Sequence, residues 1–189
     1  MMNMDRKRII EITTSLFKKY GLKTMTIYEI SLRLGITKTS FYEHFTTKEE
    51  LLRECLTMMN EDIEKLLVVV ASSHVSVLTK ITSVYTITVE YLSQFNSTFY
   101  FDLKKKSTFK GMISAQIEAY RMKWIRPLLQ EAMNENLLTA NTDIGEAVDF
   151  FMMFTAHFLR NFKDDPVAIN NHINLFLKKY KSNSLKQIT

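Results

Sequence analysis

Apolar side chains recur every three or four residues along most of this 189-residue chain, and that is the spacing of one face of an α-helix. Stripes of this kind predict helices over residues 5–20, 47–67, 78–95, 143–162 and 166–181, with a short helix between 97 and 106. A long helix is expected over 108–137, and Pro127 should kink or restart it because proline lacks a backbone N–H. Residues 68–73 interrupt the pattern with β-branched and small side chains, so we expect a loop there.

Near the start of the chain the helical pattern is divided by residues typical of helix ends. Thr26 with Glu29, and Thr47 with Glu50, have the spacing of capping boxes, which begin helices. Gly35 stands where the first of these helices has to end, because a left-handed backbone costs glycine least. Three short helices are therefore predicted in close succession, which is the layout of a helix-turn-helix.

The middle of the three predicted helices, residues 38–45, has an apolar and a polar face. Phe41 and Phe45 lie four residues apart and should face the core, while Lys38 and Tyr42 lie on the opposite side. An exposed helix of this kind fits the major groove of B-DNA, with base contacts near its N-terminus. The candidate DNA-contact residues are Thr26, Tyr28, Thr37, Lys38, Thr39, Ser40, Tyr42, His44 and Lys48.

The charge of the chain agrees with such a surface but does not by itself require it. The formal net charge is +5 and the isoelectric point is about 9.2. Up to Met59 there are ten Lys and Arg against seven Asp and Glu, so +3 of the excess lies in this part. Arg6, Lys7 and Arg8 are expected to be mobile in the free protein, as a DNA-reaching arm or a merely solubilising tail.

The segment resembles the DNA-binding domain of the tetracycline-repressor (TetR) family of bacterial transcription regulators. The similarity covers residues 5–52, roughly a quarter of the chain, and departs mildly with Ser31 for Ala, Thr39 where Gly is common and Phe41 for Leu. The matching positions are Thr26, Ile30-Ser31, Gly35-Ile36-Thr37, Phe41-Tyr42-Glu43-His44-Phe45 and Lys48-Glu49-Glu50-Leu51. The resemblance implies an all-α protein with about nine helices. It also implies a three-helix helix-turn-helix DNA-binding domain at 1–50 and a helical ligand-binding and dimerisation domain at 51–189.

Composition narrows the class of protein further. Four Gly and two Pro favour long helices, and the single Cys55 excludes an internal disulfide and suits a reducing cytoplasm, where we expect a buried structural thiol. No signal peptide or membrane-spanning stretch is apparent, so no membrane partner is expected. The four His form no close metal-ligand pair, and no catalytic motif is present, so we expect neither an enzyme nor a cofactor.

Two further sites are expected in the C-terminal part. Tyr85, Gln116, Tyr120 and Trp124 combine flat apolar surfaces with polar tips, and the resemblance implies that such residues line a cavity for a small, mostly apolar inducer. Ordinary core packing is the alternative for each of them.

The helix predicted around residues 147–162 is apolar on nearly every side, so it needs two packing partners. One of these can be a second copy of the chain, as in the dimers of the resembling family. The candidate interface residues are Phe151, Phe154, Phe158 and Phe176.

The sequence therefore predicts a homodimeric, ligand-responsive regulator that binds double-stranded operator DNA and represses transcription until an inducer releases it. The competing hypothesis is a helical small-molecule-binding or scaffold protein whose helix-turn-helix no longer binds DNA.

Overall fold

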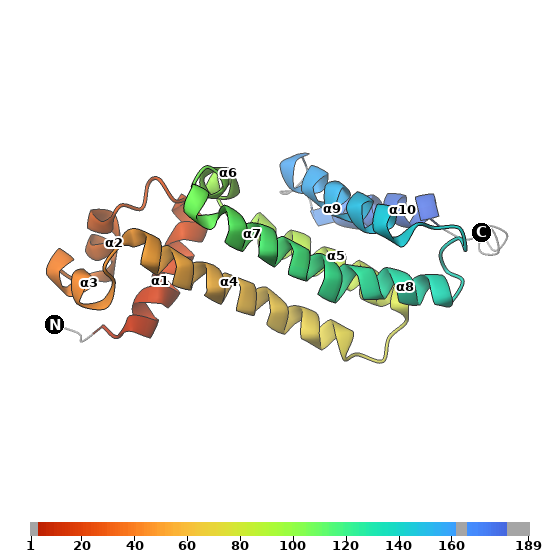
Figure 1. Cartoon of the computed structure of the whole chain (residues 1–189), viewed down its shortest axis with the longest axis horizontal. Coiled ribbons are helices and arrows are strands. Elements are labelled where there is room, and N and C mark those ends of the chain that lie inside the picture. Colours follow the sequence, from red (N-terminus) through yellow and green to blue (C-terminus); the bar gives the residue numbers. More distant parts are fainter. Residues whose placement is uncertain (1–3, 162–165, 181–189) are drawn as a thin grey trace. The chain divides into compact units, whose positions relative to one another are not determined.

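The computed structural model describes residues 4–161 and 166–180, and these residues are predominantly helical (Figure 1). The helices are α1 (Arg6–Tyr20), α2 (Ile27–Leu34), α3 (Lys38–His44), α4 (Lys48–Ala71), α5 (Val77–Ser93), α6 (Phe99–Lys104), α7 (Ser107–Tyr120), the π-helical η1 (Arg121–Ile125), α8 (Arg126–Asn134), α9 (Ile144–Asn161) and α10 (Pro166–Tyr180). The predicted all-α fold is confirmed.

The chain packs as two compact units. The first comprises Met1–Glu64 and Gln94–Ile113, and the second comprises Lys65–Ser93 and Ser114–Thr189. Each unit is thus built from two separate stretches of sequence. Helices α4 and α7 each contribute one part to the first unit and one part to the second.

The predicted helix ends of the first unit are found where the sequence placed them. The hydroxyls of Thr26 and Thr37 accept hydrogen bonds from the backbone N–H three residues later, at 3.2 and 3.0 Å. Gly35 ends α2 in the left-handed region, with φ of 67°. The small Ser31 is buried one turn earlier, as the steep crossing of helices in this motif requires.

Two expectations for the N-terminal half are wrong. Helix α4 continues through residues 68–71, where we expected a loop, because β-branched side chains lower helix propensity only slightly and a favourable context overrides that preference. Arg6 does not belong to a mobile arm, because its guanidinium is held by contacts to α3 and α4. Cys55 is buried as expected, and burial raises the pKa of its thiol to about 12, which makes it unreactive.

The proline of the long predicted helix coincides with a local change of helix type. Pro127 lies in the first turn of α8, directly after the π-helical residues of η1. A proline removes one backbone donor and clashes with the preceding turn, and one turn of wider helix accommodates both effects. The helical run from α7 through η1 into α8 continues without a break, so the structure shows a change of helix type next to Pro127 and not the start of a separate helix.

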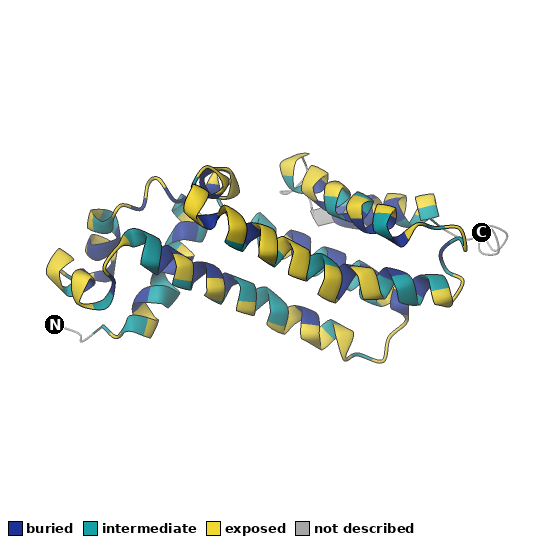
Figure 2. Ribbon diagram, in the orientation of Figure 1, coloured by how far each residue is buried: buried dark blue, intermediate teal, exposed yellow. Residues whose placement is uncertain are grey.

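The core of the second unit lies between α5, α8, α9 and α10 (Figure 2). Tyr85 of α5 is fully buried, and its hydroxyl is hydrogen-bonded to Nδ1 of His172 on α10 at 2.6 Å. The ring of His172 stacks on that of Phe154 at 3.6 Å between centroids, and burial lowers the pKa of this histidine. Among the described residues, no helix is both long and apolar enough to cross a membrane.

Candidate nucleic-acid interface

Helix α3 presents one face to its own unit and the other to solvent. Phe41 and Phe45 are buried to 0% and 1% exposure, and their ring centroids lie 5.8 Å apart. On the opposite side Lys38, Thr39 and Tyr42 are exposed, as Figure 2 shows for this helix. The buried pair fixes the helix in place, so the outer side chains stand on a firm support.

The exposed surface of α3 continues onto α2. Tyr28 of α2 is 57% exposed, and Nζ of Lys38 lies 5.5 Å from its ring centroid. A cation held over an aromatic face keeps its charge while its position is restricted. Lys38 and Tyr28 therefore form one surface of mixed aromatic and basic character, which suits contact with both bases and phosphates.

Three of the predicted contact hydroxyls also have a structural use. Those of Thr26 and Thr37 cap their helices, and the hydroxyl of Thr37 also lies within hydrogen-bonding distance of that of Ser40, at 3.3 Å. Capping places Thr26 at the N-terminus of α2, where free backbone N–H groups and the helix dipole attract anions.

The last two predicted DNA-contact residues lie at the ends of the α3–α4 connection. His44 is half-buried, and its carbonyl oxygen accepts a hydrogen bond from Arg6. Nζ of Lys48 donates to the carbonyl of Leu22 at 2.5 Å, and burial lowers the pKa of this ammonium. A phosphate contact by Lys48 therefore requires its ammonium to leave Leu22.

The N-terminal segment that contains α2 and α3 is similar in sequence to known bacterial regulators. Residues 9–55 match the family described as bacterial regulatory proteins of the tetR family. An uncharacterised HTH-type transcriptional regulator of Bacillus subtilis, YerO, is 47% identical over 51 residues, which cover 27% of this chain and 18% of that protein. The HTH-type transcriptional repressor KstR2 of Mycobacterium tuberculosis is 35% identical over 54 residues, 29% of this chain and 27% of the repressor. In these alignments the chain thus spans less than a third of either relative.

Solved structures extend the likeness of fold to nearly the whole chain. The structure of KstR2 from Mycobacterium tuberculosis has a TM-score of 0.71 at 17% identity, covering 97% of this chain and 98% of that one. A TetR transcriptional regulator from Chloroflexus aurantiacus has a TM-score of 0.76 at 15% identity, covering 92% of each chain. The N-terminal domain is of the TetR family. The relatives named here are described as transcription regulators.

Outside the TetR-family domain, the predicted inducer-contact residues lie in the second unit. Tyr85 bonds to His172, and Tyr120 bonds to Thr88 at 2.6 Å. Because the hydroxyl hydrogen of Thr88 goes to the carbonyl of Val84, Tyr120 is the donor in that bond. Trp124 is buried and Gln116 is half-buried. All four candidates are thus close to or within the core, and the two tyrosine hydroxyls already have partners.

A hollow in this core is too small to hold a ligand as it stands. Its walls are apolar, and it leaves no room for a water molecule. The lining residues are Ile81, Val84, Ile125, Leu128, Leu129 and Phe151. A ligand at this place has to displace side chains, and the ligand site stays a prediction.

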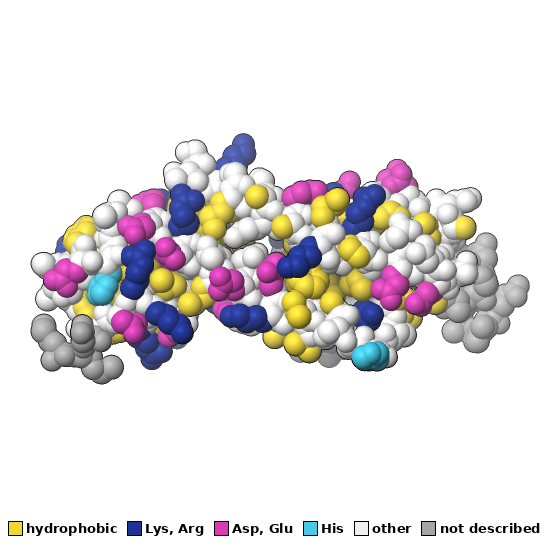
Figure 3. All heavy atoms as spheres, turned by 60° about the horizontal axis from the view of Figure 1, so that its bottom comes forward, with side chains coloured by type: hydrophobic (Ala, Val, Ile, Leu, Met, Phe, Trp, Pro, Cys, Tyr) yellow, Lys and Arg dark blue, Asp and Glu magenta, His cyan; other side chains and the backbone are white. Residues whose placement is uncertain are grey.

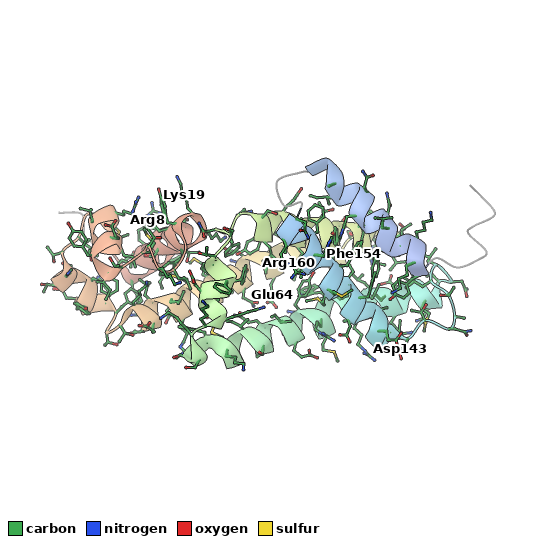
Figure 4. The ribbon with its side chains drawn as sticks, turned by 90° about the horizontal axis from the view of Figure 1, so that it is seen from above. Arg8, Lys19, Glu64, Asp143, Phe154 and Arg160 are labelled. Carbon is green, nitrogen blue, oxygen red and sulfur yellow. The ribbon has the colours of Figure 1, made fainter. Side chains whose placement is uncertain are left out.

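The predicted dimer-contact residues lie on α9 and α10, which run side by side (Figure 1). Phe151, Phe158 and Phe176 are buried in the core of the second unit, which differs from the expectation that they line an interface with a partner. Phe154 is half-buried against His172. Figure 4 shows α9 with Asp143 at its beginning and Phe154 and Arg160 further along.

The sequence did not single out the apolar side chains that these two helices do expose. Met153 on α9 is 58% exposed and Leu175 on α10 is 61% exposed. Both positions were visible as apolar residues one or two places from the named phenylalanines, but only the packing of α9 on α10 decides which of them faces outward. A partner surface on this helix pair would use Met153 and Leu175.

Proposed function

We propose that this chain is a homodimeric transcription regulator of the TetR family that binds operator DNA in the cytoplasm and is released by a small, mostly apolar inducer. The observation that carries the proposal is the exposed face of α3, where Lys38, Thr39 and Tyr42 are unobstructed while Phe41 anchors the helix from behind. A helix with this exposure is what major-groove recognition requires.

The direct test is selection of bound duplexes from a random-sequence DNA pool. The full chain should recover a motif with two related half-sites, spaced by one helical turn or a multiple of it. Recovery of no enriched sequence would favour the alternative of a scaffold or small-molecule-binding protein that has lost DNA binding.

The salt dependence of binding reports how many phosphates are contacted. We expect a dimer to contact roughly eight phosphates, which gives a slope of about −7 in a plot of log affinity against log salt concentration. Figure 3 shows acidic and basic side chains interspersed on the face that it draws. Titration of the selected duplex between about 50 and 200 mM salt measures the slope. A slope near zero would contradict the electrostatic part of the proposal.

Lys38 should read base identity. Lys38→Ala is expected to cost about 1–3 kcal/mol per lost base-pair contact and to relax the preference at that position of the motif. The matched comparison is Lys48→Ala, because Lys48 is predicted to touch a phosphate and should weaken all sequences alike. Repeating the selection with each variant separates the two effects, and an unchanged motif with Lys38→Ala would show that Lys38 reads no base.

An inducer should act on the core around Tyr120 and Trp124. At 100 times its dissociation constant it should stabilise the dimer by about 2.7 kcal/mol per site and quench the fluorescence of Trp124, the only tryptophan. A screen of small apolar and aromatic compounds with both readouts identifies binders. Tyr120→Phe removes only the hydroxyl that bonds to Thr88, so it should weaken the response while operator binding persists. Binders that protect the wild-type chain and this variant equally would exclude Tyr120 from the site.

A further inference from the structure

The guanidinium of Arg6 joins three helices of the first unit. Arg6 lies in the first turn of α1, where Asp5 caps the helix by accepting from the N–H of Arg8 at 2.7 Å. Its Nη1 donates to the carbonyl of His44, the last residue of α3. Its Nη2 donates to Glu50 at 3.0 Å and to Glu54 at 3.2 Å, both on α4. One planar group thus holds the end of α3 and the first turns of α4 together.

The same contacts order the connection between α3 and α4. Cζ of Arg6 lies 4.1 Å from the ring centroid of Phe45, the residue that ends α3. Glu50 accepts hydrogen bonds from both the backbone N–H and the hydroxyl of Thr46, each at 2.8 Å. Hydrogen bonding to Thr46, and after it to Arg6, lowers the pKa of Glu50, so this carboxylate is charged at neutral pH. Arg6 and Glu50 together thus hold Phe45 and Thr46, the residues just after α3.

We propose that Arg6 is a positioning residue for DNA recognition, which fixes the end of α3 relative to α4 without itself touching DNA. The inference rests on the proposed function, because it assigns to Arg6 the orientation of the helix that carries Lys38 and Tyr42. A guanidinium suits this role because its donors lie in one rigid plane and reach several acceptors at once, whereas a lysine ammonium is a single point on a flexible stem. The three printed contacts engage three of its five N–H donors inside the protein, and in the proposed role the side chain, which is 42% exposed, makes no phosphate contact.

The central variant is Arg6→Gln, measured on the duplex selected by the wild-type chain. Loss of the charged hydrogen bonds should lower affinity about 5- to 30-fold, because binding then has to order the α3–α4 connection. The salt slope should stay at its wild-type value, because no phosphate contact is lost. Amide hydrogen exchange at Phe45 and Thr46 should become faster, while the amides of Ile9 and Ile30 in the buried core keep their protection.

Arg8→Gln is the matched control. It removes the same charge from the same helical turn, but the side chain of Arg8 is exposed and pairs with Glu11 at 3.1 Å within α1. This variant should change affinity by less than about 2-fold, as is usual for an exposed pair. Arg6→Lys keeps the positive charge but loses the planar set of guanidinium donors, so this variant should bind DNA as weakly as Arg6→Gln.

Each outcome separates this inference from its competitors. A salt slope that falls by about one unit per subunit in Arg6→Gln would mean that Arg6 contacts a phosphate directly. DNA binding at the wild-type level by Arg6→Lys would mean that only the charge of Arg6 matters. Unchanged binding by Arg6→Gln would mean that Arg6 has no part in DNA recognition. Each of these three results overturns the positioning role of Arg6 but leaves the proposed function standing. A wild-type chain that selects no duplex overturns both.

Discussion

Replacing Phe41 with alanine should strongly destabilise the first unit, lowering its free energy of unfolding by about 3–5 kcal/mol. The side chain is fully buried, contacts the ring of Phe45 and meets that of Tyr42 edge-on at 5.5 Å between centroids. The cost is a large share of the roughly 5–15 kcal/mol that holds a typical domain together. Chemical denaturation followed by helical circular dichroism measures the loss.

The neighbouring Tyr42 is the matched control for Phe41. It lies on the same short helix but is 52% exposed, so Tyr42→Ala should cost no more than about 1.5 kcal/mol, the upper value for an edge-on aromatic pair such as the one it forms with Phe41. Operator affinity should nevertheless fall, because Tyr42 faces the groove in the proposed complex. Equal losses of stability in the two variants would show that the outer face of α3 is not free for DNA.

Leu175→Glu should convert the proposed dimer to monomers and lower operator affinity by about 10²- to 10⁴-fold, because two linked half-site contacts become one. Leu175 is 61% exposed on α10, so a carboxylate there leaves the fold of the monomer intact but cannot be buried against a second copy without a large desolvation cost. Sedimentation at micromolar concentration reports the oligomeric state. Phe158→Glu is unsuitable for the purpose, because that side chain is fully buried and the variant would misfold.

Val69→Glu provides the control for Leu175→Glu. Val69 is 68% exposed on α4, so the variant introduces the same charge at a similarly exposed apolar position away from the α9–α10 pair. It should sediment as a dimer. Monomers from both variants would point to a general effect of charge, and dimers from both would place the interface elsewhere.

The sequence predicts the helices and their ends well because these depend on neighbours a few residues apart. Thr26, Gly35 and Thr37 act on backbone groups within three or four positions, so their spacing alone is informative. The exposed face of α3 follows from the same periodicity. The amino-acid types at residues 68–71 do not decide between helix and loop, because their preferences for the two nearly balance. In the structure α4 continues through these residues.

Contacts between distant parts of the chain are beyond this kind of prediction. Arg6 meets partners 38 to 48 residues away, and Tyr85 meets His172 across 87 residues. Periodicity shows that α9 is apolar on several sides but not which side α5 and α10 cover. For that reason the sequence alone does not distinguish Phe151 and Phe158, which are buried, from Met153, which is exposed.

The first unit is discontinuous in sequence, and this restricts how the proposed DNA specificity can be transferred to another protein. Residues 94–113 complete the unit through the hydrogen bond from Asn96 to the carbonyl of Lys18, at 2.7 Å, and through the ion pair of Lys106 with Glu49. A fragment cut after residue 64 would leave the partners of Phe99 and Phe109 facing water. A chimera that exchanges only the first 64 residues with a related protein would therefore join mismatched halves of one core. Exchanging residues 94–113 as well would transfer the complete first unit.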